Sequence, residues 1–445
     1  MKAFKLALAA SAAFALPFSA TAPALAQSAD ADAPAAQSQD EKLRALFAAD
    51  DEASLKRNPL SALFRGDMRY ADQLGDYISD AYYDAERQAA KDNLAALAAI
   101  DRAALNPTNK IAYDIFKLNQ EDTIKGLSDE YLPLTIVRPL DHFSGFHTFY
   151  PTFSSGDGAA PFKTLEDYEN NLKRHAQFVA LIDKAIDRFK QGQASGVVET
   201  KLTVRNMIEQ LDGQLAQPIE ESPYYGPVLK FPEDIGPQDR ARLTKDYRAM
   251  IADQIYPALQ RLRDYFADSY LADAREGVGL KYMKGGDKLY QFMIEQTTTL
   301  PLTAAEIHKL GLSEVARITK EMEAIKQEVG FKGTLHEFFD YIRTDPKFKP
   351  KSREDLTQRY YAIGKEVDAV IGTQFKVLPK TPLEIRPYEE FREKFEAGGS
   401  YQSGSPDGSR PGVFYFNAYD LPSRTTPGET TLYLHEGAPG HHFQI

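Results

Sequence analysis

The sequence predicts a mainly α-helical protein, an elongated assembly of many helices with one short antiparallel β element near its C-terminal end. Three observations predict this class. Apolar residues recur at helical spacing over most of the chain, and helix-capping signatures precede several of these stretches. A β-prone run, residues 413–416, follows a segment rich in glycine and serine.

The first residues have the order of a secretory signal. Lys2 and Lys5 precede an apolar run over residues 6–18, and Ala24 and Ala26 supply the small residues of a cleavage site after Ala26. We therefore expect a signal peptide over residues 1–26, a flexible leader over 27–40 and a periplasmic protein. The apolar run is shorter than the roughly 20 residues of a membrane helix, and no other stretch approaches that length.

Length and composition limit the remaining possibilities. A chain of 445 residues exceeds the size at which single cores stop growing, about 250–300 residues, so two or more subdomains are expected. The absence of cysteine excludes disulfides, thiolate ligands, a cysteine nucleophile and a lipid-anchored cysteine. A net charge of −11 argues against nucleic acid as a partner and favours a neutral or positive substrate. Oligomeric state is left open.

Residues 41–300 and 301–397 are predicted to be two helical regions. In the second, Val315, Ile318, Met322, Ile325 and Val329 recur at alternating intervals of three and four, as in an amphipathic helix. In the first, a long helix is predicted over residues 238–272, with a proline in its middle that should bend it. The pairs that predict helix N-termini are Thr164 with Asp167, Thr303 with Glu306, Thr334 with Glu337, and Ser352 with Asp355.

The last region, residues 398–445, is predicted to hold a loop, an edge strand and the start of a metal-binding helix. Glycine, serine and proline dominate residues 398–412, and the strand follows at 413–417. Thr426, a proline and Glu429 form a capping signature for the next helix. That helix carries His435, Glu436, His441 and His442.

These four side chains indicate a metal site with a general base. On a straight helix, at roughly 100° per residue, His441 lies about 120° around the axis from His435, while His442 lies about 10 Å further along it. Neither can share one zinc with His435, because zinc–nitrogen bonds are only about 2 Å long. Pro439 and Gly440 allow the helix to bulge or break between Ala438 and His441, which brings His441 to the position of the second ligand.

We therefore predict His435 and His441 as ligands of Zn²⁺ and Glu436 as the base that deprotonates a bound water. His441 is preferred over His442, which stays an alternative. The competing interpretation is that neighbouring histidines near a chain end form a solvated surface feature. A break in a helix costs stability, so a break that served no function would only destabilise the protein. This argues against that interpretation.

Substrate contacts are predicted beside the helix. In zinc peptidases an edge strand next to the metal helix binds the substrate backbone as an added strand, and residues 413–417 are placed for this role. Tyr415 and Asn417 on this strand, with Arg410 just before it, are the predicted substrate-binding residues. A strand that only packs is the alternative for 413–417, and a surface salt bridge is the alternative for Arg410.

A family resemblance joins these motifs. Residues 407–417, 420–424 and 435–444, with 297–312 further upstream, closely resemble the bacterial domain-of-unknown-function 885 family. The resemblance implies a mostly helical zinc peptidase of the gluzincin type with a divergent His-Glu-x-x-Pro-Gly-His motif. It assigns His435 and His441 as metal ligands and Glu436 as the base. It also implies a third ligand, a glutamate on a later helix that has no counterpart in these residues, so the site is expected to be incomplete.

The leading hypothesis is an exported zinc metallopeptidase that hydrolyses peptides. The rival is a non-catalytic periplasmic binding or scaffold protein of helical build, whose histidines hold metal loosely or not at all. Peptide length, sequence preference and the end of the substrate attacked do not follow from the sequence.

Overall fold

The computed structural model describes residues 37–445 except 144, 157–159, 389–392, 394–395 and 405–410. The predicted class is confirmed, because helices make up most of the described chain and its β-structure is one three-stranded sheet and an isolated bridge. The expected signal peptide and residues 27–36 of the expected leader lie outside the described part. The first helix begins within the last residues of the expected leader. Ser38 caps its N-terminus, because the Ser38 side chain accepts a hydrogen bond from the backbone N–H of Glu41.

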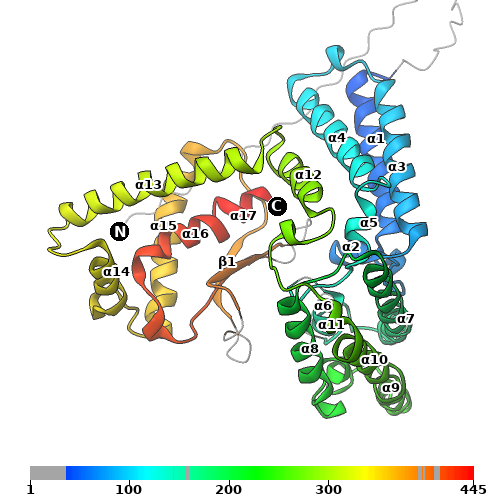
Figure 1. The fold of residues 1–445 in the computed structure, drawn as a ribbon. Coiled ribbons are helices and arrows are strands. Elements are labelled where there is room, and N and C mark those ends of the chain that lie inside the picture. Colours follow the sequence, from blue (N-terminus) through cyan, green and yellow to red (C-terminus); the bar gives the residue numbers. More distant parts are fainter. Residues whose placement is uncertain (1–36, 144, 157–159, 389–392, 394–395, 405–410) are drawn as a thin grey trace, which may run out of the picture.

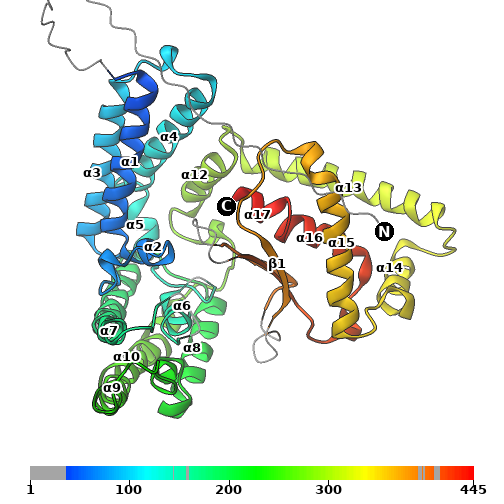
Figure 2. The same ribbon diagram turned by 180° about the vertical axis from the view of Figure 1, so that it is seen from behind.

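The N-terminal helices form one side of the molecule, and the C-terminal elements form the other (Figures 1 and 2). None of the helices in the described part of the chain is both long and apolar enough to cross a membrane. The N-terminal helices are α1 (Gln39–Arg57), α2 (Pro59–Phe64), α3 (Asp80–Ala98), α4 (Pro107–Gly126), α5 (Leu132–Thr135), α6 (Phe146–Phe153), α7 (Leu165–Ser195), α8 (Lys201–Leu215), α9 (Pro237–Met250), α10 (Tyr256–Tyr265), α11 (Leu271–Asp273) and α12 (Gly286–Thr298).

The largest core lies around α7. Phe178, Ile182 and Phe189 on α7 are fully buried, and they share one apolar cluster with Leu259 and Leu262 of α10. The predicted capping box at Thr164 is formed, which fixes where α7 begins. A long amphipathic helix that starts at a defined residue presents its apolar stripe to its neighbours along its whole length.

The helix predicted over residues 238–272 is present with two local changes of winding. Segments of π-helix at Ile251–Ile255 and Phe266–Tyr270 join α9, α10 and α11. The first of them directly precedes α10, whose second residue is Pro257. Because proline has no backbone N–H to donate, a widened turn next to it accommodates the missing bond without ending the helix.

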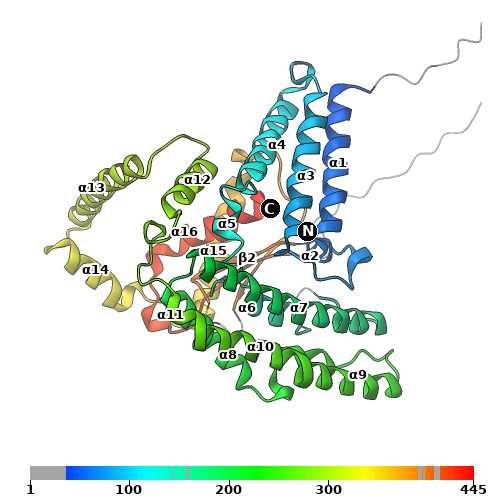
Figure 3. The same cartoon turned by 45° about the vertical axis from the view of Figure 1, so that its right-hand side comes forward.

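The C-terminal unit contains the remaining helices and the sheet. Its helices α13 and α14 lie at the end of the molecule away from α7 and α9 (Figure 3). The elements are α13 (Ala304–Glu328), α14 (Leu335–Thr344), α15 (Arg353–Gln374), β1 (Leu383–Pro387), β2 (Gly399–Gln402), β3 (Gly412–Phe416), α16 (Glu429–Glu436) and α17 (Gly440–Gln444).

Helix α13 has the predicted boundaries but not a buried face. Its capping box of Thr303 and Glu306 is formed, and Gly330 follows its end with a φ of 75°. Yet the apolar stripe is exposed, and Val315 keeps 64% of its surface accessible. Among the described residues, α13 packs mainly against α14, so this stripe has no covering partner there.

The sheet differs from the predicted β element in two ways. Strand β3 lies in the centre, in the order β1-β3-β2, so the predicted edge strand is in fact the middle strand. It pairs antiparallel with β2, as expected of a hairpin-like neighbour, but parallel with β1. Strand β1 falls inside the region predicted to be helical, where a short alternation of apolar and charged residues, Leu383 to Arg386, is the signal for a strand.

Helix α15, from the predicted region 301–397, shares a core with the sheet and with α16. The ring of Tyr360 on α15 lies 5.1 Å from that of Phe414 and 4.8 Å from that of Phe416, measured between centroids. Tyr433 of α16 belongs to the same cluster. This core supports the helix that carries the histidines.

Candidate metal centre

Helix α16 is held by its buried side and presents the other side outward. Tyr433 is buried, with its ring edge-on to that of Phe414 at 5.7 Å. Gly364 of α15 lies so close that an added Cβ would be 3.0 Å from the Tyr433 hydroxyl oxygen. His435 and Glu436 follow at the C-terminal end of α16, where the His435 side chain is 68% exposed and that of Glu436 is 15% exposed.

The start of α16 differs from the prediction. Residues Thr426–Gly428 form a 3-10 turn, and the helix begins at Glu429 without a side-chain cap. Glu429 is buried, and its Oε2 accepts from the Nε of Arg359 on α15 at 2.7 Å. Burial raises the pKa of the Glu429 carboxyl, and the Arg359 guanidinium opposes that rise. Glu429 therefore ties α16 to α15 instead of capping it.

The helix breaks where the sequence predicts. Helix α16 ends at Glu436, the backbone N–H of Gly437 donates to the Tyr433 carbonyl oxygen at 2.8 Å, and the Ala438–Pro439 bond is cis. A new helix, α17, starts at Gly440. A Cβ on Gly440 would overlap the carbonyl oxygen of His435, so only glycine lets the chain fold back this closely over the end of α16.

This break brings three predicted residues together. One ligand atom from each of His435, Glu436 and His441 lies within 4.8 Å of the others. The Nε2 of His441 is 3.6 Å from Glu436 Oε2, and the Nε2 of His435 is 4.0 Å from Glu436 Oε1. The two imidazole rings are 5.0 Å apart at an angle of 83°. The geometry thus assembles two imidazoles and a carboxylate on one small surface.

The donor set fits zinc in chemistry and nearly in spacing. Imidazole nitrogens and carboxylate oxygens are ordinary zinc ligands at about 2.0–2.2 Å, which places tetrahedral ligand atoms about 3.3 Å from one another. The ligand atoms of His435 and His441 lie within 4.8 Å of each other, so they need to close by up to about 1.5 Å to reach that spacing. Since the side chains of His435 and His441 are 68% and 41% exposed, small rotations about their χ angles can supply this closure.

His442 points elsewhere. It is buried, and its Nδ1 lies 2.9 Å from the hydroxyl of Tyr401 on β2. Burial lowers the pKa of His442 below its ordinary value. His442 also lines, with Tyr433 and Phe443, a mostly apolar hollow of about 460 Å³ between α15, β1 and α17. Among the described residues, the helix break brings His441, and not His442, into the cluster with His435 and Glu436.

The predicted substrate residues have different surroundings from those expected. Tyr415 lies on the central strand and is mostly buried, with its ring stacked on that of Tyr388 at 5.5 Å. The side-chain N–H₂ of Asn417 donates to backbone carbonyls of Glu393, Glu396 and Ala397 at 2.7–3.0 Å. The Asn417 amide therefore holds the protein's own loop, and the Tyr415 ring packs against a neighbouring ring. Arg410 lies outside the described residues.

Tyr401, which was not predicted from the sequence, also lies at this site. Its ring stacks on that of His441, with centroids 6.2 Å apart and planes within 15°, while its hydroxyl bonds His442. The glycines and serines around it indicated a loop, and the strand partner Phe414 that fixes its direction lies in a later segment. An aromatic residue placed opposite a β-prone run was the available signal.

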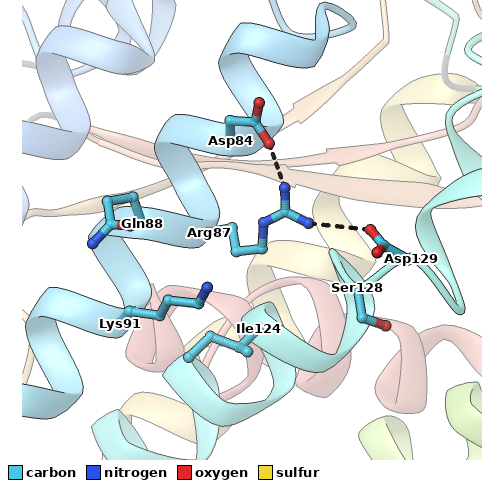
Figure 4. Close-up of a pocket in the computed structure, with 7 residues that line it drawn as sticks. All are labelled: Asp84, Arg87, Gln88, Lys91, Ile124, Ser128 and Asp129. Atoms are coloured by element: carbon cyan, nitrogen blue, oxygen red, sulfur yellow. Dashed lines mark hydrogen bonds and ion pairs between the residues drawn. The ribbon is translucent and has the colours of Figure 1, made fainter.

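A second hollow, of about 460 Å³, lies between α3 and α4 in the N-terminal region (Figure 4). Arg87 crosses it, bonded to Asp84 and to the carbonyl of Leu127, with Asp129 at 3.7 Å. Its central cation is therefore already neutralised by the protein's own groups. We assign this hollow no role in the chemistry of the histidines.

Comparison with known proteins places the chain in a family. A bacterial protein family of unknown function, DUF885, matches residues 59–445. No curated protein matches the chain. The crystal structure of a candidate lipoprotein from Colwellia psychrerythraea has the same fold at a TM-score of 0.78 and 24% identity, over 92% of this chain and 72% of that one.

A second solved structure is a candidate lipoprotein of unknown function from Shewanella oneidensis, with a TM-score of 0.59 and 14% identity over the same shares of the two chains. At these identities the two structures establish the fold alone. The family match covers most of the sequence, including the helix break, His435 and His441. The chain therefore belongs to the bacterial DUF885 family.

Proposed function

We propose that the protein is an exported zinc-dependent peptidase whose metal is held by His435 and His441 and whose general base is Glu436. The observation that supports this most is the convergence of these three side chains within 4.8 Å across a helix break. A His-Glu pair on a helix, followed by a second histidine on the same side, is the arrangement that zinc hydrolases use.

Each residue has a defined task in this proposal. The two exposed imidazoles supply neutral nitrogen ligands. A zinc ion bound there would polarise a peptide carbonyl and acidify a water molecule. The Glu436 carboxylate, close to both imidazoles and mostly shielded from solvent, takes a proton from water at one of its oxygens and returns it to the leaving amine nitrogen.

The peptide is proposed to lie along β2. A sheet is extended by a peptide at an outer strand, and β2 holds that position next to α16, whereas β3 is central. An added Cβ on Gly399 of β2 would be 3.3 Å from Leu432 of α16, so the strand and the metal helix are in direct contact. A peptide aligned on β2 would therefore run close to the histidines.

Export is proposed from the N-terminal sequence. Residues 1–26 have the charge, apolar run and small-residue site of a secretory signal. The two similar solved structures are described as candidate lipoproteins, which are exported proteins, and this supports the same side of the membrane for the present chain.

Replacing Glu436 with glutamine in the whole protein tests the assignment. We expect this variant to keep its zinc, measured by elemental analysis, and to lose cleavage of a mixed peptide library followed by mass spectrometry. Glu366→Gln, an exposed carboxylate on α15, is the control and should cleave as the wild type does. Undiminished cleavage by the Glu436→Gln protein would refute the role of Glu436. A wild-type protein with neither zinc nor cleavage would favour the rival, a helical binding or scaffold protein.

A further inference from the structure

Tyr401 sits between the two histidines of α17. Its hydroxyl lies 2.9 Å from the Nδ1 of His442, and its ring lies nearly parallel to that of His441 at 6.2 Å. The ring of His442 meets it edge-on at 5.8 Å. One side chain on β2 therefore contacts the predicted ligand and the residue after it at the same time.

Strand β3 lies directly beside this contact, at Gly412. A Cβ on Gly412 of β3 would overlap the Tyr401 hydroxyl and would lie 2.8 Å from the Nδ1 of His442. The position therefore requires glycine, because any side chain would push the two residues apart. Gly412 is itself held by pairing with Leu383 of β1 and by donating its N–H to the Pro382 carbonyl at 2.9 Å.

Helix α17 is too short to set its own direction and is placed by its contacts, which include the ring of Phe443 edge-on to that of Phe375 at 5.1 Å. It spans five residues, Gly440–Gln444, and follows a break in which Gly437 and Gly440 allow several backbone conformations. An isolated helix of this length is not stable by itself. The position of His441 relative to His435 therefore depends on what α17 contacts, and His442 is the buried polar residue through which it contacts β2.

We propose that Tyr401 and His442 are positioning residues that hold His441 toward His435 and Glu436 and so set the affinity of the site for zinc. This inference rests on the proposed function. Its physical basis is that a ligand kept in place before the metal binds loses less conformational freedom on binding. Changes to residues that orient metal ligands typically weaken metal binding by about 10–100-fold.

The probe is the zinc ion alone, titrated into metal-free protein in competition with a chromogenic chelator. Tyr401→Phe keeps the stacked ring and removes the hydroxyl, and His442→Leu removes its partner. We expect each to weaken zinc binding by about 10–100-fold. His442→Asn, whose side-chain amide lies near the position of Nδ1, should restore most of the affinity. Tyr388→Phe is the matched control, because it removes a hydroxyl that bonds Ser400 on the same strand at 2.6 Å without touching a histidine.

Two readouts separate positioning from general damage. Circular dichroism and thermal unfolding should match the wild type for Tyr401→Phe, while the visible spectrum of its cobalt-substituted form should change, because that spectrum reports ligand geometry. Wild-type affinity and an unchanged cobalt spectrum in Tyr401→Phe would overturn the inference and leave the proposed function standing. A wild-type protein that binds no zinc would instead overturn the proposed function, and the inference with it.

Discussion

The N-terminal helices and the C-terminal unit bury their apolar side chains to very different degrees. Around α7 and α10, a single large cluster contains many fully buried aromatic and aliphatic residues. In the C-terminal unit the main cluster is small and confined to α15, the sheet and α16, while the apolar stripe of α13 is exposed. The candidate metal centre lies in the second region, at the surface of its small core.

The side chains that contribute most to stability and the side chains of the candidate metal centre therefore lie in different regions. Packing in the N-terminal region stabilises the fold, and its buried histidines are engaged with neighbouring side chains. In the C-terminal unit the side chains of His435 and His441 are 68% and 41% exposed, so an incoming ion could reach them. Variants in the two regions should therefore change different measurements, and the following predictions test that separation in order of decreasing effect.

The largest effect is expected on the free energy of unfolding at low pH, through the N-terminal core. Burial lowers the pKa of His175 to about 3, from an ordinary value of 6.5. The unfolded chain takes up this proton first, so stability is fully present above pH 6.5 and falls by about 1.4 kcal/mol per pH unit as the pH drops toward 3. His175→Gln should flatten the pH dependence of the free energy of unfolding over this range. His308→Gln, at an exposed position on α13, should leave it unchanged.

Phe178→Ala should destabilise the N-terminal region by about 3–5 kcal/mol, because it opens a cavity in a packed aromatic cluster. Phe178 is fully buried, and its ring stacks on that of Tyr150 at 4.4 Å. Urea unfolding followed by circular dichroism measures the loss. Phe143→Ala removes the same side chain where it is 87% exposed and should cost less than about 0.5 kcal/mol. Equal losses in both variants would contradict the packing described for this core.

Gly440→Ala should cost about 1–3 kcal/mol through overpacking and should also abolish zinc binding. The new Cβ overlaps the His435 carbonyl, so α16 and α17 have to separate. Gly428→Ala, at the start of α16 in open space, is the control and should keep the metal. Calorimetric titration with zinc distinguishes the two proteins. Full zinc affinity in Gly440→Ala would show that zinc binding does not depend on the close approach of α17 to the end of α16.

The smallest effect is expected on α13. Val315→Ala and Ile325→Ala should each change the free energy of unfolding by no more than about 0.5 kcal/mol, because both side chains are exposed. Ile182→Ala, fully buried on α7, should cost about 2–5 kcal/mol in the same assay. A loss above about 2 kcal/mol at either α13 position would mean that this stripe is covered in solution.

Local signals in the sequence predicted local structure well. The capping boxes at Thr164, Thr303 and Thr334 are formed, and the helix break at Pro439 and Gly440 lies where the backbone chemistry requires it. These features depend on residues within four positions of one another, so a single sequence contains them.

Features that depend on distant partners were not predicted. The parallel pairing of β1 with β3 joins segments about thirty residues apart, and it turned a predicted edge strand into a central one. Glu429 matched a capping signature, yet it is buried against Arg359, seventy residues earlier. The contact of Tyr401 with His442 spans forty-one residues. Tertiary packing decided each of these, and local sequence does not reveal such partners.

The most direct test of the metal centre is a crystal structure of the zinc-loaded protein with anomalous scattering data collected at the zinc edge. We expect one strong anomalous peak at about 2.0–2.2 Å from the Nε2 atoms of both His435 and His441, with Glu436 beside it. A peak bound by His442, or no peak near the break between α16 and α17, would contradict it.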